Sequence, residues 1–116
     1  PDYLDATEAG SCALHMLGWT GDFNDGYNFI GTWFAGFDKQ WGFKDKKVFD
    51  AVNAGSKMGK ADERTAAYEK ANEVIMDYLP GVPISSSPPA IAFGKNVNPP
   101  NVSPLTQEVF AEASFK

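Results

Sequence analysis

The aromatic residues of this chain are concentrated in one short stretch, and no other feature constrains the fold as strongly. Ten of the sixteen Phe, Trp and Tyr residues lie between Trp19 and Phe49. Burial of each large ring removes about 150–250 Å² of surface from water. A chain of 116 residues forms at most one domain, and only one of its predicted helices carries a full apolar stripe. We therefore expect a domain that is poorly closed by itself.

Charge and composition exclude several classes of protein. Fifteen acidic and ten basic residues give a net charge of −5. A chain of this charge without a basic cluster binds nucleic acid poorly, because phosphates are neutralised by Lys and Arg. One Cys and one His exclude both a four-ligand Cys/His zinc site and an internal disulfide. No apolar run reaches the roughly 18 residues of a membrane-spanning helix. We predict no metal and no cofactor.

The first third of the chain predicts two helices, a strand and a turn. Residues 3–9 predict a short helix that ends at Gly10, and the apolar run 12–17 predicts a strand buried on both faces. Residues 18–26 have the Gly, Asn and Asp content of a turn. Asp25 is the expected N-cap of the next helix. The apolar face of that helix consists of Phe29, Ile30, Trp33, Phe34 and Phe37.

Two further helices are predicted in the middle of the chain. Asp45 is the expected N-cap of a helix that Gly55 closes, with an apolar stripe at Val48, Phe49 and Val52. Asp62 is the expected N-cap of a longer helix over residues 63–79, which Pro80-Gly81 ends. The stripe of this longer helix is wide enough to face a core, and it consists of Ala67, Ala71, Val74, Ile75 and Tyr78.

The last third predicts short strands separated by prolines. Residues 82–86 and 91–93 are predicted strands, divided by Pro88-Pro89, which does not fit within a central strand. Residues 96–104 predict an irregular loop, and alternation over residues 108–115 predicts a final strand. The elements together predict an α/β fold of the mixed α+β type.

Two acidic side chains in the predicted turn, Asp22 and Asp25, suggest chemistry. An EF-hand calcium loop does not fit, because its fifth position counted from Asp22 is Gly26 and its twelfth is Trp33. Acid–base catalysis by the carboxylate pair stays open, although two acids on one tight turn usually point to one side. His15 lies in an apolar run, where a packed and hydrogen-bonded side chain is commoner than a base.

The segment Gly18-Trp19-Thr20-Gly21-Asp22-Phe23 follows an apolar run and leads into a turn and a helix. It resembles the ligand-binding strand of the dipeptide/oligopeptide-binding proteins, the family 5 solute-binding proteins of bacterial ABC importers, in which the pattern is Gly-Trp-x-x-Asp-aromatic. One departure is Asp25-Gly26, where many relatives have Asp-Pro. Further blocks in the order of the family are Tyr3-Leu4-Asp5, Phe49-Asp50-Ala51-Val52, the Arg-x-x-x-Tyr-x-x-Ala helix from Arg64 to Ala71, and Pro80-Gly81-Val82-Pro83-Ile84.

The resemblance implies roles for individual residues in ligand binding. The Asp22 carboxylate would pair with the α-ammonium group of a bound peptide. The backbones at Gly18 and Thr20 would pair with the main chain of the peptide by strand addition, since positions 18, 20 and 22 share one parity along a strand. Trp19, and with it Phe23, would face the cleft and help to form a side-chain pocket. The predicted ligand-binding residues are Gly18, Trp19, Thr20, Asp22 and Phe23.

The resemblance covers essentially all of residues 1–116 and implies a C-terminal segment of a periplasmic-binding-protein type II fold, incomplete alone. Residues 1–81 would belong to the C-terminal ligand-binding lobe, and residues 82–116 would return toward the N-terminal lobe. No signal peptide precedes Pro1, which we interpret as a chain that begins inside a longer protein. The implied protein is periplasmic or extracytoplasmic and is not an enzyme. Its implied partners are a peptide and a membrane permease.

Three alternatives stay open at this stage. The same fold could bind an oligosaccharide or a metal complex, with Trp19, Phe23 and Trp33 stacking on a sugar face. The exposed rings could instead dock on another protein, so that the chain is an interaction module. A small carboxylate hydrolase that depends on Asp22 is the third. In addition, a segment separated from the rest of its lobe would expose several rings, so we expect the isolated chain to self-associate.

Overall fold

The computed structural model describes residues 2–116, which form two compact units. The first unit is the chain up to Trp19 together with Asp25–Val82, and the second is Thr20–Asn24 together with Pro83–Lys116. Helices dominate the first unit, and a two-stranded sheet lies in the second. The predicted α+β class is therefore confirmed. The assignment of residues 1–81 and 82–116 to parts of two lobes stays a prediction.

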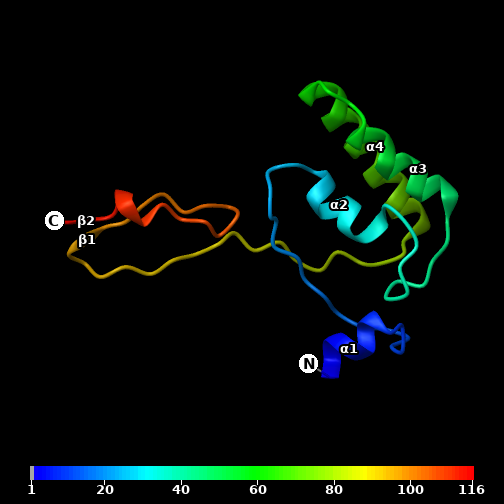
Figure 1. Ribbon diagram of the computed structural model, residues 1–116, viewed down its shortest axis with the longest axis horizontal. Helices are drawn as coiled ribbons and strands as arrows, with labels where there is room; N and C mark the ends of the chain where they lie inside the picture. The colour runs from blue at the N-terminus through cyan, green and yellow to red at the C-terminus, as the bar shows by residue number, and fades with distance from the viewer. Residues whose placement is uncertain (1) are drawn as a thin grey trace. The chain divides into compact units, whose positions relative to one another are not determined.

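The first unit is built from α-helices, drawn as coiled ribbons in Figure 1. The largest interhelical contact lies between α3 and α4, and α2 packs against both. The predicted helix at the start of the chain is confirmed as α1, and Gly10 follows it with a positive φ of 70°. The bounds are α1 Asp2–Glu8, α2 Tyr27–Phe34, α3 Lys46–Ser56 and α4 Ala61–Tyr78.

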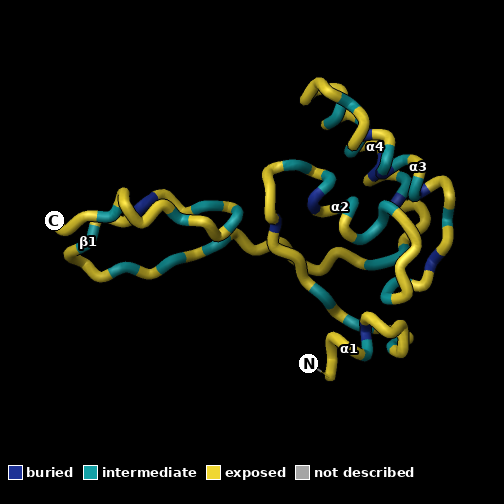
Figure 2. Tube along the Cα trace, in the orientation of Figure 1, coloured by how far each residue is buried: buried dark blue, intermediate teal, exposed yellow. Residues whose placement is uncertain are grey.

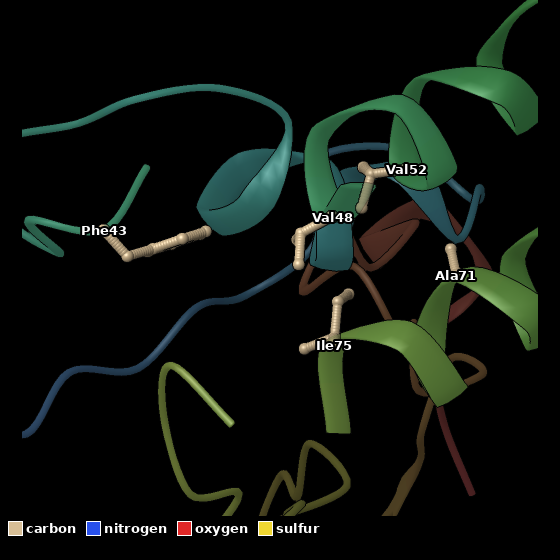
Figure 3. Close-up of a cluster of buried hydrophobic side chains, with 5 residues drawn as sticks. All are labelled: Phe43, Val48, Val52, Ala71 and Ile75. Carbon is tan, nitrogen blue, oxygen red and sulfur yellow. The ribbon is translucent and has the colours of Figure 1, made fainter. Parts of the chain in front are cut away.

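The core of the first unit lies where α3 meets α4. Val48 and Val52 are one helical turn apart on α3 and are fully buried, and Ala71 and Ile75 are one turn apart on α4. The four side chains point toward one another in Figure 3, with Phe43 beside them. Partly buried residues surround this cluster, seen as teal stretches of the tube in Figure 2. The predicted stripes of both helices thus meet, except that Tyr78 is 46% exposed.

The predicted N-terminus of α3 is correct, whereas its end lies beyond the predicted Gly55, at Ser56. Asp45 caps α3 as predicted, because its Oδ1 accepts a hydrogen bond from the Val48 backbone N–H at 2.9 Å. The prediction that Asp62 caps the next helix is wrong, since α4 begins at Ala61 and its N-cap is Lys60 without a side-chain hydrogen bond. Asp62 lies instead in the first turn, where a negative charge favours the helix dipole. Leu79 ends α4 in a left-handed conformation.

The prediction of a buried strand over residues 12–17 is wrong. These residues have no regular secondary structure, and the side chains of Leu14 and Met16 are 92% and 67% exposed. A strand needs a partner for its backbone groups, and none pairs with this segment in the described chain. The Tyr3 hydroxyl takes that place at Met16, where it accepts from the backbone N–H and donates to the carbonyl oxygen.

The second unit contains a short antiparallel ladder. Strand β1 (Val97–Asn98) pairs with β2 (Ser114–Phe115), so that Val97 lies opposite Phe115 and Asn98 opposite Ser114. A 3-10 turn, η1, covers Phe110–Glu112. The predicted strand over residues 108–115 is therefore correct only at its end, and the strands predicted over 82–86 and 91–93 are absent. Pro83 removes a ladder donor from the first of these segments, and Pro88 and Pro89 do so between the two.

We expect Gly55→Ala to destabilise the chain. A Gly-to-Ala change inside a helix is ordinarily favourable by about 1 kcal/mol. A Cβ on the buried Gly55 of α3, however, would come within 3.0 Å of the Tyr68 ring. Such overpacking costs about 1–3 kcal/mol, so the free energy of unfolding measured in urea should fall. Gly59→Ala is the control, because nothing lies within 4 Å of its Cβ position. Equal stability of the two variants would contradict the position of Tyr68.

We expect the isolated chain to self-associate through exposed rings of the first unit. Phe29 and Phe37 are 47% and 50% exposed, and contiguous apolar surface on a soluble chain promotes association. Sedimentation velocity should show a mass that rises with concentration, and replacing Phe29 and Phe37 by Asp should reduce it. A wild-type chain that stays monomeric over the whole concentration series would contradict this expectation.

Candidate functional site

The five predicted ligand-binding residues lie on an exposed stretch without regular secondary structure. Gly18 and Trp19 belong to the first unit, whereas Thr20, Asp22 and Phe23 belong to the second. All five are exposed. Asp22 has no hydrogen-bond or ion-pair partner within residues 2–116. The role of each of these residues in binding stays a prediction.

Trp19 is held by two contacts with α2, although it lies outside that helix. Its indole Nε1 donates a hydrogen bond to Asn28 Oδ1 at 3.0 Å. Its ring meets Trp33 edge to face, with centroids 5.8 Å apart and an interplanar angle of 80°. The Trp19 side chain nevertheless remains 43% exposed. It is therefore fixed on one side and open on the other.

The ring of Trp33 begins a connected series of aromatic contacts within the first unit. Trp33 meets Trp41 edge to face at 5.1 Å, and Trp41 in turn contacts Phe34 at 6.1 Å. Phe34 contacts Phe43, which is among the buried residues of the core. These separations are within the range in which aromatic pairs attract one another. The aromatic stretch thus connects the exposed Trp19 to the core between α3 and α4.

His15 is packed against this series, as the sequence suggests. Its ring lies 5.1 Å from Trp41, and its Nε2 is buried without a hydrogen-bond partner in the described chain. The prediction of a packed side chain is confirmed, but the expected hydrogen bond at this nitrogen is absent.

Asp25 joins the start of α2 to α4. Its Oδ1 accepts a hydrogen bond from the Tyr27 backbone N–H at 2.9 Å, and its Oδ2 lies 3.0 Å from Arg64 Nε. The Tyr68 hydroxyl also donates to this carboxylate. Asp25 thus satisfies a free N–H at the helix start, as predicted, although the N-cap position is held by Gly26, one residue later than predicted. The Asp25 carboxylate is already engaged by partners within the fold, which argues against a catalytic pair with Asp22.

The environment of Tyr68 follows from this arrangement. Burial, the hydrogen bond to Asp25 and the negative charge of Asp25 together raise the pKa of Tyr68 from 10.0 to about 12. Its ring lies against Gly26 and Gly55, where a Cβ on either glycine would clash with it. Sequence reasoning missed the link between Asp25 and α4. The available signal was the spacing of Arg64 and Tyr68, which puts both side chains on one face of α4.

A shallow groove of about 450 Å³ lies between α2 and α4. None of the predicted ligand-binding residues lines it. Its lining consists of Gly26, Phe29, Ile30, Thr65, Tyr68, Glu69 and Asn72.

Within residues 2–116, no cluster of three or more His, Cys, Asp and Glu side chains has a geometry that could hold a metal ion. Cys12 is a free thiol. The helices of the described chain include none that is long and apolar enough to cross a membrane.

Comparison with known proteins shows which class of protein contains similar sequences. The chain is 28% identical over 114 residues to di/tripeptide-binding protein 3 of Pseudomonas aeruginosa strain UCBPP-PA14, and this match covers 94% of the chain and 21% of that relative. A dipeptide-binding protein of P. aeruginosa strain PAO1 matches with the same identity and coverage. A probable deoxycholate-binding periplasmic protein of Escherichia coli K12 is 30% identical over 87 residues, which are 74% of the chain and 16% of the relative.

These similarities confirm the resemblance to the dipeptide/oligopeptide-binding proteins that the sequence blocks indicated. Each of the three is named as a binding protein or a probable one, and two of them are named for dipeptides or tripeptides. The chain spans about a fifth of the length of the curated relatives that it matches over 94% of its own length. No protein-family profile and no solved structure matches it.

We expect Tyr68→Phe to weaken the folded state at neutral pH by about 1 kcal/mol, the typical net value of a hydrogen bond. Because folding raises the pKa of Tyr68 from 10.0 to about 12, this stabilisation is complete below pH 10. It declines as the pH rises through about 12. The stability difference between wild type and variant, measured by urea unfolding, should therefore shrink in strong alkali.

The hydroxyl titration itself provides the control for this prediction. Tyrosinate absorbance of the wild type should include one group that titrates near pH 12, and that group should vanish in Tyr68→Phe. Tyr78→Phe removes a hydroxyl from an exposed ring and should leave the late group in place. Persistence of the late titration in Tyr68→Phe would refute the assignment.

Proposed function

We propose that this chain is part of an extracytoplasmic solute-binding protein that captures peptides for an ABC importer. The observation that carries the proposal is the similarity over 94% of the chain to proteins named for dipeptides and tripeptides. The exposed segment from Gly18 to Phe23 supports it, because it presents backbone groups and a carboxylate to solvent.

The proposed chemistry at Asp22 is the pairing of opposite charges. A free peptide N-terminus is a cation, and a buried cation is strongly destabilised unless it has an anionic, hydrogen-bonded partner. Asp22 is exposed in the described chain, so its carboxylate is free to meet an incoming ammonium group. Closure of two lobes around the peptide would then remove both charges from water and strengthen their attraction.

The proposed contacts of the peptide main chain lie at Gly18 and Thr20. An extended peptide added to a strand edge receives main-chain hydrogen bonds whatever its side chains are. Hydrogen bonds to the backbone would then provide affinity, and the proposed pocket beside Trp19 would determine which side chains are preferred. The segment has no strand partner in the described chain, so the peptide itself would supply the pairing on one edge.

In this proposal the protein binds and releases its ligand without making or breaking a covalent bond, and it would therefore not be an enzyme. The two lobes would close about a hinge, and the closed form would be recognised by the membrane permease. The hydrolase alternative loses support because Asp25, the second acid that it needs, is paired with Arg64 at 3.0 Å. Turnover of a substrate that Asp22→Asn abolishes would restore it.

A second ligand class is suggested by one relative. The chain is 30% identical to a protein named as probably deoxycholate-binding. Deoxycholate carries a carboxylate and no ammonium group, so Asp22 would repel it rather than pair with it. The presence of an exposed acid at position 22 therefore favours the peptide over the bile acid.

We expect Asp22→Ala, made in the full-length protein, to lose most of its affinity for an unblocked dipeptide. Leaving a buried ammonium group unpaired costs about 2–5 kcal/mol, which corresponds to about thirty-fold or more in the dissociation constant. Isothermal titration calorimetry measures it directly. Glu73→Ala, which removes an exposed negative charge on α4, is the charge-matched control and should bind normally.

Blocked ligands complete this experiment. An N-acetylated dipeptide has no ammonium group, so Asp22→Ala should affect its binding far less than that of the free dipeptide. Unchanged affinity for the unblocked peptide would sink the assignment of Asp22. Binding of deoxycholate or of oligosaccharides without any binding of peptides would overturn the proposed ligand class.

A further inference from the structure

Trp19 differs from other exposed rings of the first unit because α2 holds it through both its polar and its apolar edges. The indole nitrogen donates to Asn28 Oδ1 at 3.0 Å, and the ring packs edge to face on Trp33. Phe29 and Phe37 are exposed to a similar degree, but neither side chain has a hydrogen-bonding group that would fix its orientation.

Asn28 is placed to impose this orientation. It is the second residue of α2 and is only 2% exposed. Burial of a side-chain amide costs free energy unless the amide is hydrogen-bonded. The indole nitrogen of tryptophan can donate a hydrogen bond but cannot accept one. Turning the Trp19 ring over would therefore separate a buried acceptor from its donor. The hydrogen bond thus selects one orientation of the ring.

The ring of Trp33 packs against the same Trp19 ring. It is itself held edge to face by Trp41, with centroids 5.1 Å apart and an interplanar angle of 81°. Two successive contacts of this type place a packed ring behind Trp19. The Asn28 bond and the Trp33 backing leave 43% of the Trp19 side chain exposed.

We propose that Asn28 and Trp33 are positioning residues that hold Trp19 as a fixed apolar wall, so that the protein prefers ligands with aromatic or aliphatic side chains. This inference rests on the proposed function and deepens it. The indole N–H, the only hydrogen-bonding group of the ring, is already used by Asn28 and is not available to a ligand. What Trp19 offers is ring surface, which attracts apolar groups and whose negative face disfavours a carboxylate.

The test uses the full-length protein and two short series of dipeptides, Ala-X and X-Ala, with Phe, Leu, Ser or Asp at X. Because the main-chain contacts are shared, differences within a series report on the side-chain pocket. In the wild type, Phe and Leu should bind about tenfold or more tightly than Ser and Asp in at least one series. Absence of any such preference would overturn the inference while leaving the proposed peptide capture intact.

Variants then separate positioning from general stability. Asn28→Leu keeps the size of the side chain but removes the acceptor, and it should reduce the preference for Phe and Leu toward unity. Its affinity for Ala-Ala should change by less than about threefold, because the main-chain contacts persist. Asn28→Asp keeps an oxygen at the acceptor position and should retain more of the preference. A uniform loss for every peptide would point to a merely structural role and would contradict the proposal.

Two further comparisons of variants test the same positioning role even if one of the single variants is unstable. In a Trp19→Ala background, where the wall is already gone, Asn28→Leu should have no additional effect on the preference. Trp33→Phe retains a ring and should weaken the preference less than Trp33→Ala. An additional effect of Asn28→Leu in the Trp19→Ala background would show that Asn28 acts elsewhere.

A spectroscopic readout tests the positioning without any ligand. The indole N–H signal of Trp19 in a ¹H–¹⁵N spectrum, assigned with Trp19→Phe, should exchange slowly with solvent in the wild type and quickly in Asn28→Leu. Fast exchange in the wild type would refute the hydrogen bond and with it the inference. Slow exchange in a protein that binds no peptide at all would leave Trp19 positioned but would overturn the proposed function.

Discussion

The carboxylate of Asp25 is the interaction on which the arrangement of the helices in the first unit depends. It meets the free backbone N–H of Tyr27, the guanidinium group of Arg64 and the hydroxyl group of Tyr68. Its side chain is only 16% exposed, so these interactions are weakly screened by water. The start of α2 is thereby fixed against α4, almost forty residues later in the chain, and the rings that follow along α2 take their positions from this start.

Two carboxylates three residues apart therefore have opposite environments. Asp25 is surrounded by donors from α2 and α4, and its charge is used within the fold. Asp22 is exposed and has no such partner in the described chain. An acid without an internal partner contributes little to the stability of this chain, so the proposed pairing of Asp22 with a ligand would not compete with a contact inside the fold. The contrast also explains why the pair is a poor acid–base couple: only one of the two is free to react.

The parts of the fold that were predictable from sequence depend on contacts close in the chain. The stripes at Val48 and Val52, and at Ala71 and Ile75, repeat every turn and mark buried faces without knowledge of a partner. The cap at Asp45 is equally local. Strands are different, because an apolar run forms one only where another segment pairs with it. Residues 12–17 lack such a segment in the described chain, and Leu14 is consequently exposed.

The same distinction holds for the candidate site. The residues Gly18 to Phe23 were predicted from a contiguous motif, whereas the contacts of Asn28 and Arg64 join different elements and were not predicted. Asn28 offered only a weak signal, a polar residue beside the apolar face of a predicted helix. Such a residue is usually assigned to solvent, and its 2% exposure becomes intelligible only once the Trp19 indole is seen to reach it.

Burial changes gradually along the series of aromatic contacts. Phe43 is 9% exposed at the core, and Trp19 is 43% exposed at the other end of the contact series. The intervening rings of Trp33, Trp41 and Phe34 link the two ends by contacts of 5.1 to 6.1 Å. The described residues include four buried aliphatic side chains in the core between α3 and α4, and the ring series extends the packing beyond them. The exposed ring of Trp19 is thus backed by ring contacts that end in the buried core, and such backing is the preorganisation on which the proposed selective surface would depend.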